Sequence, residues 1–185
     1  NFRKRLEEVW GIKAMNSNFG MADVLSIFGS ECNERDGLHF ISEGNLFVEL
    51  VDPDTGKPVP IEKGAQGEMV LTNLHKEAQP LIRFRSRDMI EVLQDSACRC
   101  GLKSFKFKVV GRSDEMLVIK GLNVYPNQVR AVINQHLDIL TGNFKIILES
   151  PPPHEVLYLK IEYGEKASLP EIEMVRFVLT KEIKT

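Results

Sequence analysis

Residues 111–126 read GRSDEMLVIKGLNVYP, and the character of the sequence changes across them. The polar, glycine-led run 111–115 follows an apolar strand pattern that ends at Val110. Beyond it, two short apolar runs flank Gly121, and Pro126 begins a helical pattern. We therefore place a domain boundary here, which divides the chain into residues 1–112 and residues 113–185.

The second part predicts a small unit with the element order ββαββα. Strands at 116–119 and 123–125 precede a helix that begins at Pro126, and strands at 144–148 and 156–163 are separated by a proline-rich turn. Ser168 and Glu171 have the spacing of a capping box, so a last helix begins there. Its inward positions are Ile172, Val175, Leu179 and Ile183.

The first part predicts mostly β-structure after one amphipathic helix, which ends at Gly11. Residues 45–51 alternate as a strand does, and the turn sequence DPDTG at 52–56 makes them the start of a hairpin. Another strand is expected at 67–72. Strands at 81–85 and 89–93 should bracket a basic turn that contains Arg87 and Asp88. The whole chain is therefore assigned to the α+β class.

The composition of the 185-residue chain argues against two classes of partner, nucleic acid and membranes. The net charge of -2 is spread along the sequence, without the basic tract that nucleic acid or an anionic membrane surface would attract. No apolar run approaches the roughly 20 residues of a membrane-spanning helix, and the amphipathic start is not a signal peptide. We expect no nucleic-acid or membrane partner and a cytoplasmic location.

Both ends of the sequence look cut. There is no initiator methionine, and the last helical pattern stops without a C-cap glycine or a polar tail. We therefore expect the chain to be a piece of a longer protein.

The sequence contains no phosphate-binding glycine motif, neither G-x-x-x-x-G-K-[ST] nor G-x-G-x-x-G. Arg83, Arg85 and Arg87 alternate with Phe84 along a strand that leads to Asp88, so the arginines should share one face. A solvated strand edge explains this pattern. A carboxylate at a strand end that accepts hydrogen bonds from ribose hydroxyls explains it as well, and composition does not choose between the two.

Four residues have the chemistry of a zinc site. Cys32 and His39 form one short cluster, and Cys98 and Cys100 form a C-x-C followed by Gly101. Four such ligands suit tetrahedral zinc in a structural role, because they leave no open coordination position. A C-x-C can chelate only from a turn, which Gly101 makes plausible. The alternative is that Cys32 is simply buried and His39 lies on a sheet.

Several stretches resemble, in order, the motifs of one enzyme family. Residues 67–74 read GEMVLTNL and residues 76–88 read KEAQPLIRFRSRD, similar to the G-E-L-V-L-T-T-L and K-E-A-x-P-x-I-R-Y-R-T-R-D stretches of phenylacetate-CoA ligases. Residues 111–126 are similar to their G-R-S-D-D-M-L-I-I-R-G-V-N-V-F-P. Residues 18–23, NFGMAD, resemble the Y-G-x-[ST]-E element of acyl-adenylate-forming enzymes. The similarity spans nearly the whole chain.

This resemblance implies roles by position. Asp88 would bind the ribose hydroxyls of AMP, and Arg112 would approach the nucleotide from the domain junction. Phe19 and Gly20 would lie against adenine, where phenylalanine replaces the usual tyrosine and lacks its hydroxyl. Asp23 stands where the family has a glutamate near Mg²⁺ and the phosphates, with a shorter reach.

Further roles concern movement and metal. By similarity, Asp114 is the hinge about which a small domain rotates between two half reactions, and the loop around Gly121 would line the path of coenzyme A. Some family members pair an upstream cysteine and histidine with a C-x-C-G, which supports a structural Zn²⁺ site. Residues 1–112 would then be the distal, mostly-β part of a large AMP-binding domain, and residues 113–185 a truncated mobile C-terminal domain.

The implied reaction uses ATP, Mg²⁺, a small carboxylic acid and coenzyme A, by way of an acyl-adenylate. The family's phosphate loop lies upstream of these motifs and its catalytic lysine near the C-terminus, so this chain alone is not expected to catalyse adenylation. Neither Lys120 nor Lys181 matches the lysine motif. The alternatives are an adenylyltransferase such as a deazaflavin-cofactor synthetase, or a non-catalytic module that keeps the fold. The exposed β face leaves a homodimer open.

Overall fold

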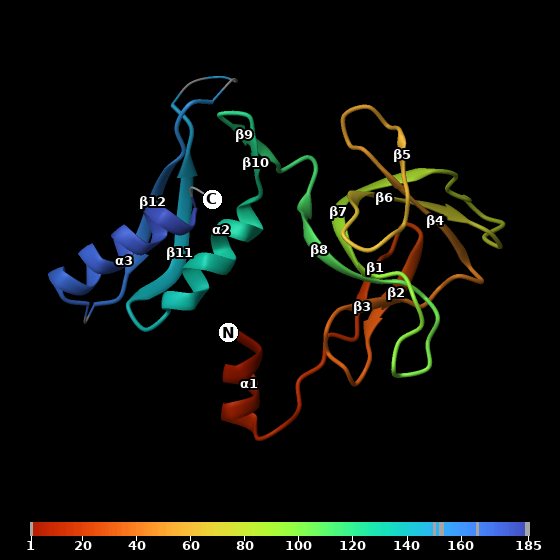
Figure 1. The fold of residues 1–185 in the computed structure, drawn as a ribbon, viewed down its shortest axis with the longest axis horizontal. Helices are drawn as coiled ribbons and strands as arrows, with labels where there is room; N and C mark the ends of the chain where they lie inside the picture. Colours follow the sequence, from red (N-terminus) through yellow and green to blue (C-terminus); the bar gives the residue numbers. More distant parts are fainter. Residues whose placement is uncertain (1, 150, 152–153, 166, 184–185) are drawn as a thin grey trace. The chain divides into compact units, whose positions relative to one another are not determined.

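The computed structural model describes residues 2–149, 151, 154–165 and 167–183. The chain forms two compact units (Figure 1). We call residues 13–114 the sheet unit, and residues 115–185, with which residues 1–12 are grouped, the small unit. The sequence placed the division between residues 112 and 113, two residues earlier. The identity of the units as parts of a larger enzyme stays a prediction.

The sheet unit consists of eight antiparallel strands in the order β1-β2-β3-β8-β7-β6-β4-β5. Side chains from β2, β3, β4, β6, β7 and β8 meet in one core, so the sheet curls until strands near its two ends share that core. Figure 1 shows this curvature in β6, β7 and β8. The strands are β1 (Phe19–Met21), β2 (Leu25–Glu31), β3 (Leu38–Phe40), β4 (Leu46–Val51), β5 (Pro58–Val59), β6 (Gln66–Asn73), β7 (Phe84–Gln94) and β8 (Lys106–Arg112).

Alternation and turn chemistry located β4 and β6 correctly, and the predicted hairpin after β4 is confirmed. Val51 pairs with Pro58, and Gly56 takes the positive φ of 69° that its turn requires. Asp52 holds this turn because its carboxylate accepts hydrogen bonds from the backbone N–H groups of Asp54 and Thr55.

The prediction of two strands on either side of a basic turn was wrong, because β7 is one strand of 11 residues. Arg85 pairs with Val70 and Met89 pairs with Glu68, so three residues of β7 lie opposite the single residue Met69. The chain therefore bulges there instead of turning, and Arg87 takes a φ of 67°. The sequence of a polar run does not show whether the chain turns there or forms a β-bulge.

The predicted ββαββα order of the small unit is confirmed. Its elements are β9 (Leu117–Ile119), β10 (Leu122–Val124), α2 (Pro126–Ile133), a 3₁₀ turn (Asn134–His136), β11 (Leu140–Ile147), β12 (Tyr158–Tyr163) and α3 (Leu169–Glu182). Val129 and Ile133 of α2 pack against Val175 and Leu179 of α3 in one core. The capping box also forms, since the backbone N–H of Ser168 donates to Glu171 at 2.8 Å.

The first helix, α1 (Phe2–Trp10), ends where the sequence predicted. Gly11 follows it with a φ of 62°, and its N–H donates to the Glu7 carbonyl at 2.9 Å. None of the described helices combines the length and apolar character that a membrane crossing needs.

Candidate functional site

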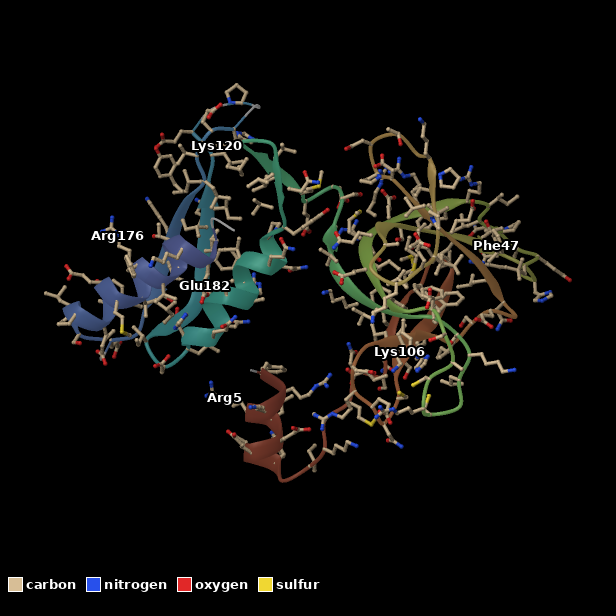
Figure 2. All side chains as sticks on the ribbon, viewed as in Figure 1. Arg5, Phe47, Lys106, Lys120, Arg176 and Glu182 are labelled. Carbon is tan, nitrogen blue, oxygen red and sulfur yellow. The ribbon has the colours of Figure 1, made fainter. Side chains whose placement is uncertain are left out.

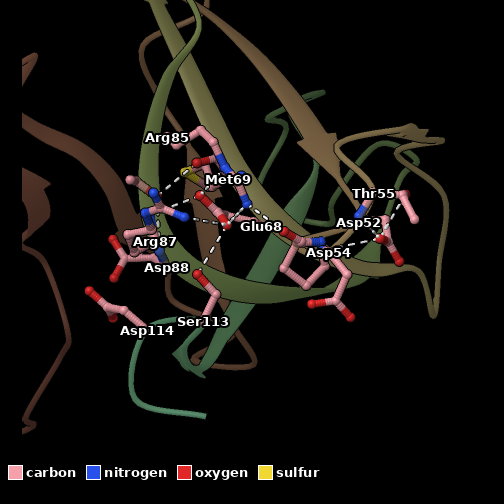
Figure 3. A network of polar contacts seen from close by, with 12 residues as sticks. Asp52, Asp54, Thr55, Glu68, Met69, Arg85, Arg87, Asp88, Ser113 and Asp114 are labelled. Carbon is pink, nitrogen blue, oxygen red and sulfur yellow. Dashed lines mark hydrogen bonds and ion pairs between the residues drawn. The ribbon is translucent and has the colours of Figure 1, made fainter.

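A buried carboxylate organises the middle of the sheet unit. Glu68 on β6 is fully buried, and both its oxygens accept hydrogen bonds from the guanidinium of Arg85 on β7, at 2.9 and 2.6 Å. The Ser113 hydroxyl donates to the same carboxylate at 3.0 Å, and Arg87 lies 4.0 Å away (Figure 3). Glu68 therefore joins the bulge of β7 to the residue just before Asp114.

This network decides the charge state of Glu68. Burial raises the pKa of its carboxyl, but hydrogen bonds from Arg85 and Ser113 and the charges of Arg85 and Arg87 outweigh burial. The net pKa lies below the ordinary value. Glu68 is therefore a carboxylate acceptor that fixes the arginine-rich bulge in place.

Asp88, the last residue of the bulge, faces Arg112, since the two are direct cross-strand partners on β7 and β8. Their side chains approach to 3.5 Å, and that of Asp88 is only 14% exposed. Burial raises the pKa of Asp88 above its ordinary value, and the positive charge of Arg112 offsets only part of that rise. The pair offers acceptor oxygens and donor nitrogens side by side to a polar ligand.

Arg112 also binds Asp114, with bidentate contacts of 2.9 and 2.8 Å. These hydrogen bonds lower the pKa of Asp114. The sheet unit ends at Asp114. One guanidinium thus connects the carboxylate of Asp88, in the middle of β7, to the last residue of the unit.

The four predicted metal ligands come together, although they lie on two segments 59 or more residues apart. The ligand atoms of Cys32, His39, Cys98 and Cys100 all lie within 4.8 Å of one another. Sγ of Cys32 is 3.9 Å from Sγ of Cys98, and Sγ of Cys100 is 3.5 Å from Nε2 of His39. The predicted turn is present too, because Gly101 has a φ of 94° and its N–H donates to the Cys98 carbonyl.

The two short distances, 3.9 Å between Cys32 and Cys98 and 3.5 Å between Cys100 and His39, are those of ligands on a tetrahedral ion. With Zn–S near 2.3 Å and Zn–N near 2.0–2.1 Å, tetrahedral angles require S···S of about 3.8 Å and S···N of about 3.6 Å. A disulfide between Cys32 and Cys98 would require about 2.05 Å between the sulfurs, and all three cysteines are free.

Neighbouring groups orient the imidazole of His39 and favour the ionised form of Cys98. Nδ1 of the buried His39 lies 3.2 Å from the Ser104 carbonyl, so a proton on Nδ1 leaves the lone pair of Nε2 toward the cysteines. The backbone N–H of Cys100 and the ammonium of Lys106 lower the pKa of Cys98 to about 6. The lowered pKa favours the thiolate form of Cys98, which is the form that binds metal.

The remaining predicted residues lie elsewhere. Phe19 on β1 is half-buried and packs edge-on against Phe28 and Phe107, with Gly20 exposed beside it. Asp23 is exposed in the turn between β1 and β2, and its carbonyl accepts a hydrogen bond from Lys76 at 2.8 Å. Gly121 belongs to the small unit, in the β9–β10 turn. Their proposed contacts with a nucleotide or a thiol stay predictions.

Sequence reasoning missed Glu68 and Lys106 as parts of these clusters. Glu68 stands among buried residues of a strand, and Lys106 stands between Phe105 and Phe107; all of these are buried. A charged residue within a buried strand is the available signal, because such a group must find a partner. The partner itself follows only from the folded structure.

Comparison with known proteins gives a consistent result. A phenylacetate-coenzyme A ligase of Thermus thermophilus is 37% identical over 166 residues, 88% of this chain. One of Aromatoleum evansii is 31% identical over 183 residues, 98% of the chain. The chain spans only 36% and 40% of these two relatives, respectively. No protein-family model matches the chain.

Solved structures show the same fold. A 2-hydroxyisobutyryl-CoA ligase in its postadenylation state, in complex with R3-HIB-AMP, matches 98% of this chain and 39% of its own, with a TM-score of 0.80 and 26% identity. An anthranilate CoA ligase in complex with anthranoyl-AMP covers 98% of this chain and 36% of its own, with a TM-score of 0.65. At 20% identity, the second likeness concerns the fold alone.

Proposed function

Because this chain belongs to the phenylacetate-coenzyme A ligase family, we propose that the protein that carries it is an ATP-dependent acid–thiol ligase. Its substrates would be an acyl or aryl carboxylic acid, ATP and coenzyme A. The observation that carries the proposal is the pair formed by Asp88, in the middle of β7, and Arg112, at the end of β8, both of which lie inside the motifs that resemble the family.

The reaction would occur in two steps. A carboxylate oxygen of the acid attacks the α-phosphorus of ATP, and the bond to pyrophosphate breaks, which leaves an acyl-adenylate. The thiol of coenzyme A then loses its proton and attacks the acyl carbon, and AMP leaves. Positive groups near the phosphates stabilise the charge that develops in the first step.

Asp88 would accept hydrogen bonds from the ribose hydroxyls of the nucleotide, as an acidic residue does in other nucleotide sites. Its low exposure supports this role, because a partly desolvated carboxylate forms stronger hydrogen bonds than one in water. Arg112, 3.5 Å away, would help to keep Asp88 charged and would contribute positive charge beside the nucleotide.

Phe19 and Gly20 would lie against the adenine ring, and Asp23 would hold Mg²⁺. The Asp23 carboxylate is exposed and is a hard oxygen ligand of the kind that Mg²⁺ prefers. The ion would supply positive charge beside the phosphates.

Asp114 would act as the hinge about which the small domain rotates between the two steps of the reaction. The end of the sheet unit at Asp114 supports this assignment, as does the bidentate contact with Arg112, which a rotation at Asp114 would have to remake. The turn at Gly121 would then line the path of the thiol; its φ of 80° suits glycine.

The cysteine cluster would hold a structural zinc ion. Four protein ligands leave no open position for a substrate on a tetrahedral ion, so the ion would brace residues 32–39 against residues 98–104 and would take no part in the reaction.

Replacing Asp88 by alanine is expected to weaken AMP binding about 10- to 100-fold in the protein that carries this chain. A hydrogen bond to a charged group contributes about 1.5–3 kcal/mol, which converts to that range. Calorimetric titration with AMP and with 2′,3′-dideoxy-AMP measures it. Wild-type protein should prefer AMP, and the Asp88→Ala variant should bind both about equally.

The exposed Asp95 of the same unit provides the control, since Asp95→Ala should keep both the affinity and the preference. An Asp88→Ala variant that still prefers AMP to the dideoxy nucleotide would exclude the ribose role.

A further inference from the structure

Lys106 is a buried cation beside the cysteine cluster. Its side chain is only 2% exposed, and the residues before and after it in the chain, Phe105 and Phe107, are buried as well. Figure 2 labels Lys106, the first residue of β8. An ammonium group is costly to bury and persists only where negative groups compensate it.

Two negative partners are within its reach. Lys106 Nζ donates to Asp36 Oδ1 at 2.6 Å, but the Asp36 side chain is 55% exposed and shares its charge with water. The sulfur of Cys98 is the second group whose negative charge acts on the ammonium. In the sheet, Lys106 is the direct cross-strand partner of His39. Lys106 therefore lies against two of the four candidate ligands, one through its strand register and one through its charge.

The charge of the proposed centre explains why a lysine stands there. Three thiolates, one neutral imidazole and Zn²⁺ sum to a net charge of −1, in a place where His39 and Cys98 are buried. A negative centre out of water needs a positive group close by. Outer partners of this kind also orient the ligands and tune the affinity for the ion.

We propose that Lys106 is a positioning residue of the metal centre: it donates to the Cys98 thiolate and neutralises the negative charge of the Cys₃His set, and Asp36 holds its ammonium in place. The inference rests on the zinc site proposed above. A purely structural role would differ, because Lys106 would then only tie residue 36 to β8, and Asp36 would matter as much as Lys106.

Zinc affinity separates these roles. We would titrate the reduced chain with zinc against a chromophoric chelator, for wild type, Lys106→Met, Lys106→Gln, Lys106→Arg and Asp36→Asn. The two neutral substitutions should weaken zinc binding about 10- to 100-fold. Lys106→Arg should recover most of the affinity, and Asp36→Asn should stay within about threefold of wild type because the cation remains.

Cobalt(II) provides a second readout that needs no activity. A hydrogen bond to a thiolate lowers the energy of its donor electrons, so its loss in Lys106→Met, which has no donor, should shift the thiolate-to-cobalt charge-transfer band to longer wavelength. Circular dichroism of each variant, with and without metal, checks that it folds. Lys106→Gln repeats the test should the methionine variant not fold.

The outcomes separate the two proposals. A wild-type chain that binds no zinc overturns the metal centre and, with it, the role of Lys106. Wild-type zinc binding with unchanged affinity in the neutral variants overturns the role of Lys106 alone. Equal losses in Lys106→Met and Asp36→Asn would also overturn it, because they would assign the effect to the ion pair.

Discussion

Replacing Cys98 by serine is expected to reduce the zinc content of the purified chain from one equivalent to none. A serine hydroxyl is a poor zinc ligand, and Cys98 is the most buried of the three cysteines, hydrogen-bonded through its sulfur to the backbone of Cys100. A metal that binds only the folded state stabilises it by about 4 kcal/mol when its concentration is a thousandfold above Kd. The variant should lose about that much.

Elemental analysis and thermal unfolding, with and without a chelator, measure both effects. The chelator should destabilise wild-type protein and leave Cys98→Ser unchanged. The exposed Ser96 lies on the same loop, so Ser96→Ala should keep one equivalent of zinc. Freshly reduced wild-type protein that contains no zinc would contradict the proposed metal centre.

Replacing Glu68 by glutamine is expected to destabilise the sheet unit by about 3 kcal/mol at neutral pH. Loss of one partner from a buried ion pair costs about 3–5 kcal/mol, and the lower end applies because Arg85 is 36% exposed and keeps some water. Glutamine preserves the size of the side chain, so the loss reports its charge. Hydrogen exchange of the β6 and β7 amides localises the effect to the sheet unit.

Glu49→Gln is the matched control. Glu49 pairs with Arg83 at 3.1 Å, but the two side chains are 24% and 56% exposed, so its loss should cost below about 1 kcal/mol. Equal losses in the two variants would contradict the importance of the Glu68 network.

The Glu68 effect should also depend on pH in one direction. The folded pKa of Glu68 lies below its ordinary value of 4.5. Its stabilisation is therefore fully present above the unfolded pKa and is lost as the pH falls through the folded pKa. The difference between wild type and Glu68→Gln should accordingly shrink below about pH 4.

The sequence predicts most of the fold because local chemistry decides it. The alternation of β4, the turn at Gly56 and the capping box at Ser168 each depend on residues close together in the chain. The bulge at Arg87 was missed because it depends on β6, where Glu68 draws the arginines of β7 inward.

The candidate metal ligands could be selected from residue type and spacing, and the structure brings all four together. The residues that surround these four ligands could not be predicted from residue type and spacing. Lys106 and Asp36 lie 70 residues apart, and Ser104 reaches His39 across 65 residues. Such partners follow from strand register, which a single sequence does not reveal.

The most direct test of the proposed ligase activity is the product that the protein carrying this chain forms from ATP, coenzyme A and a panel of aryl and aliphatic carboxylic acids. Mass spectrometry should detect an acyl-CoA thioester, with AMP and pyrophosphate released in equal amounts. An AMP conjugate that accumulates and is not consumed when coenzyme A is present would contradict the account, and would make the protein an adenylyltransferase.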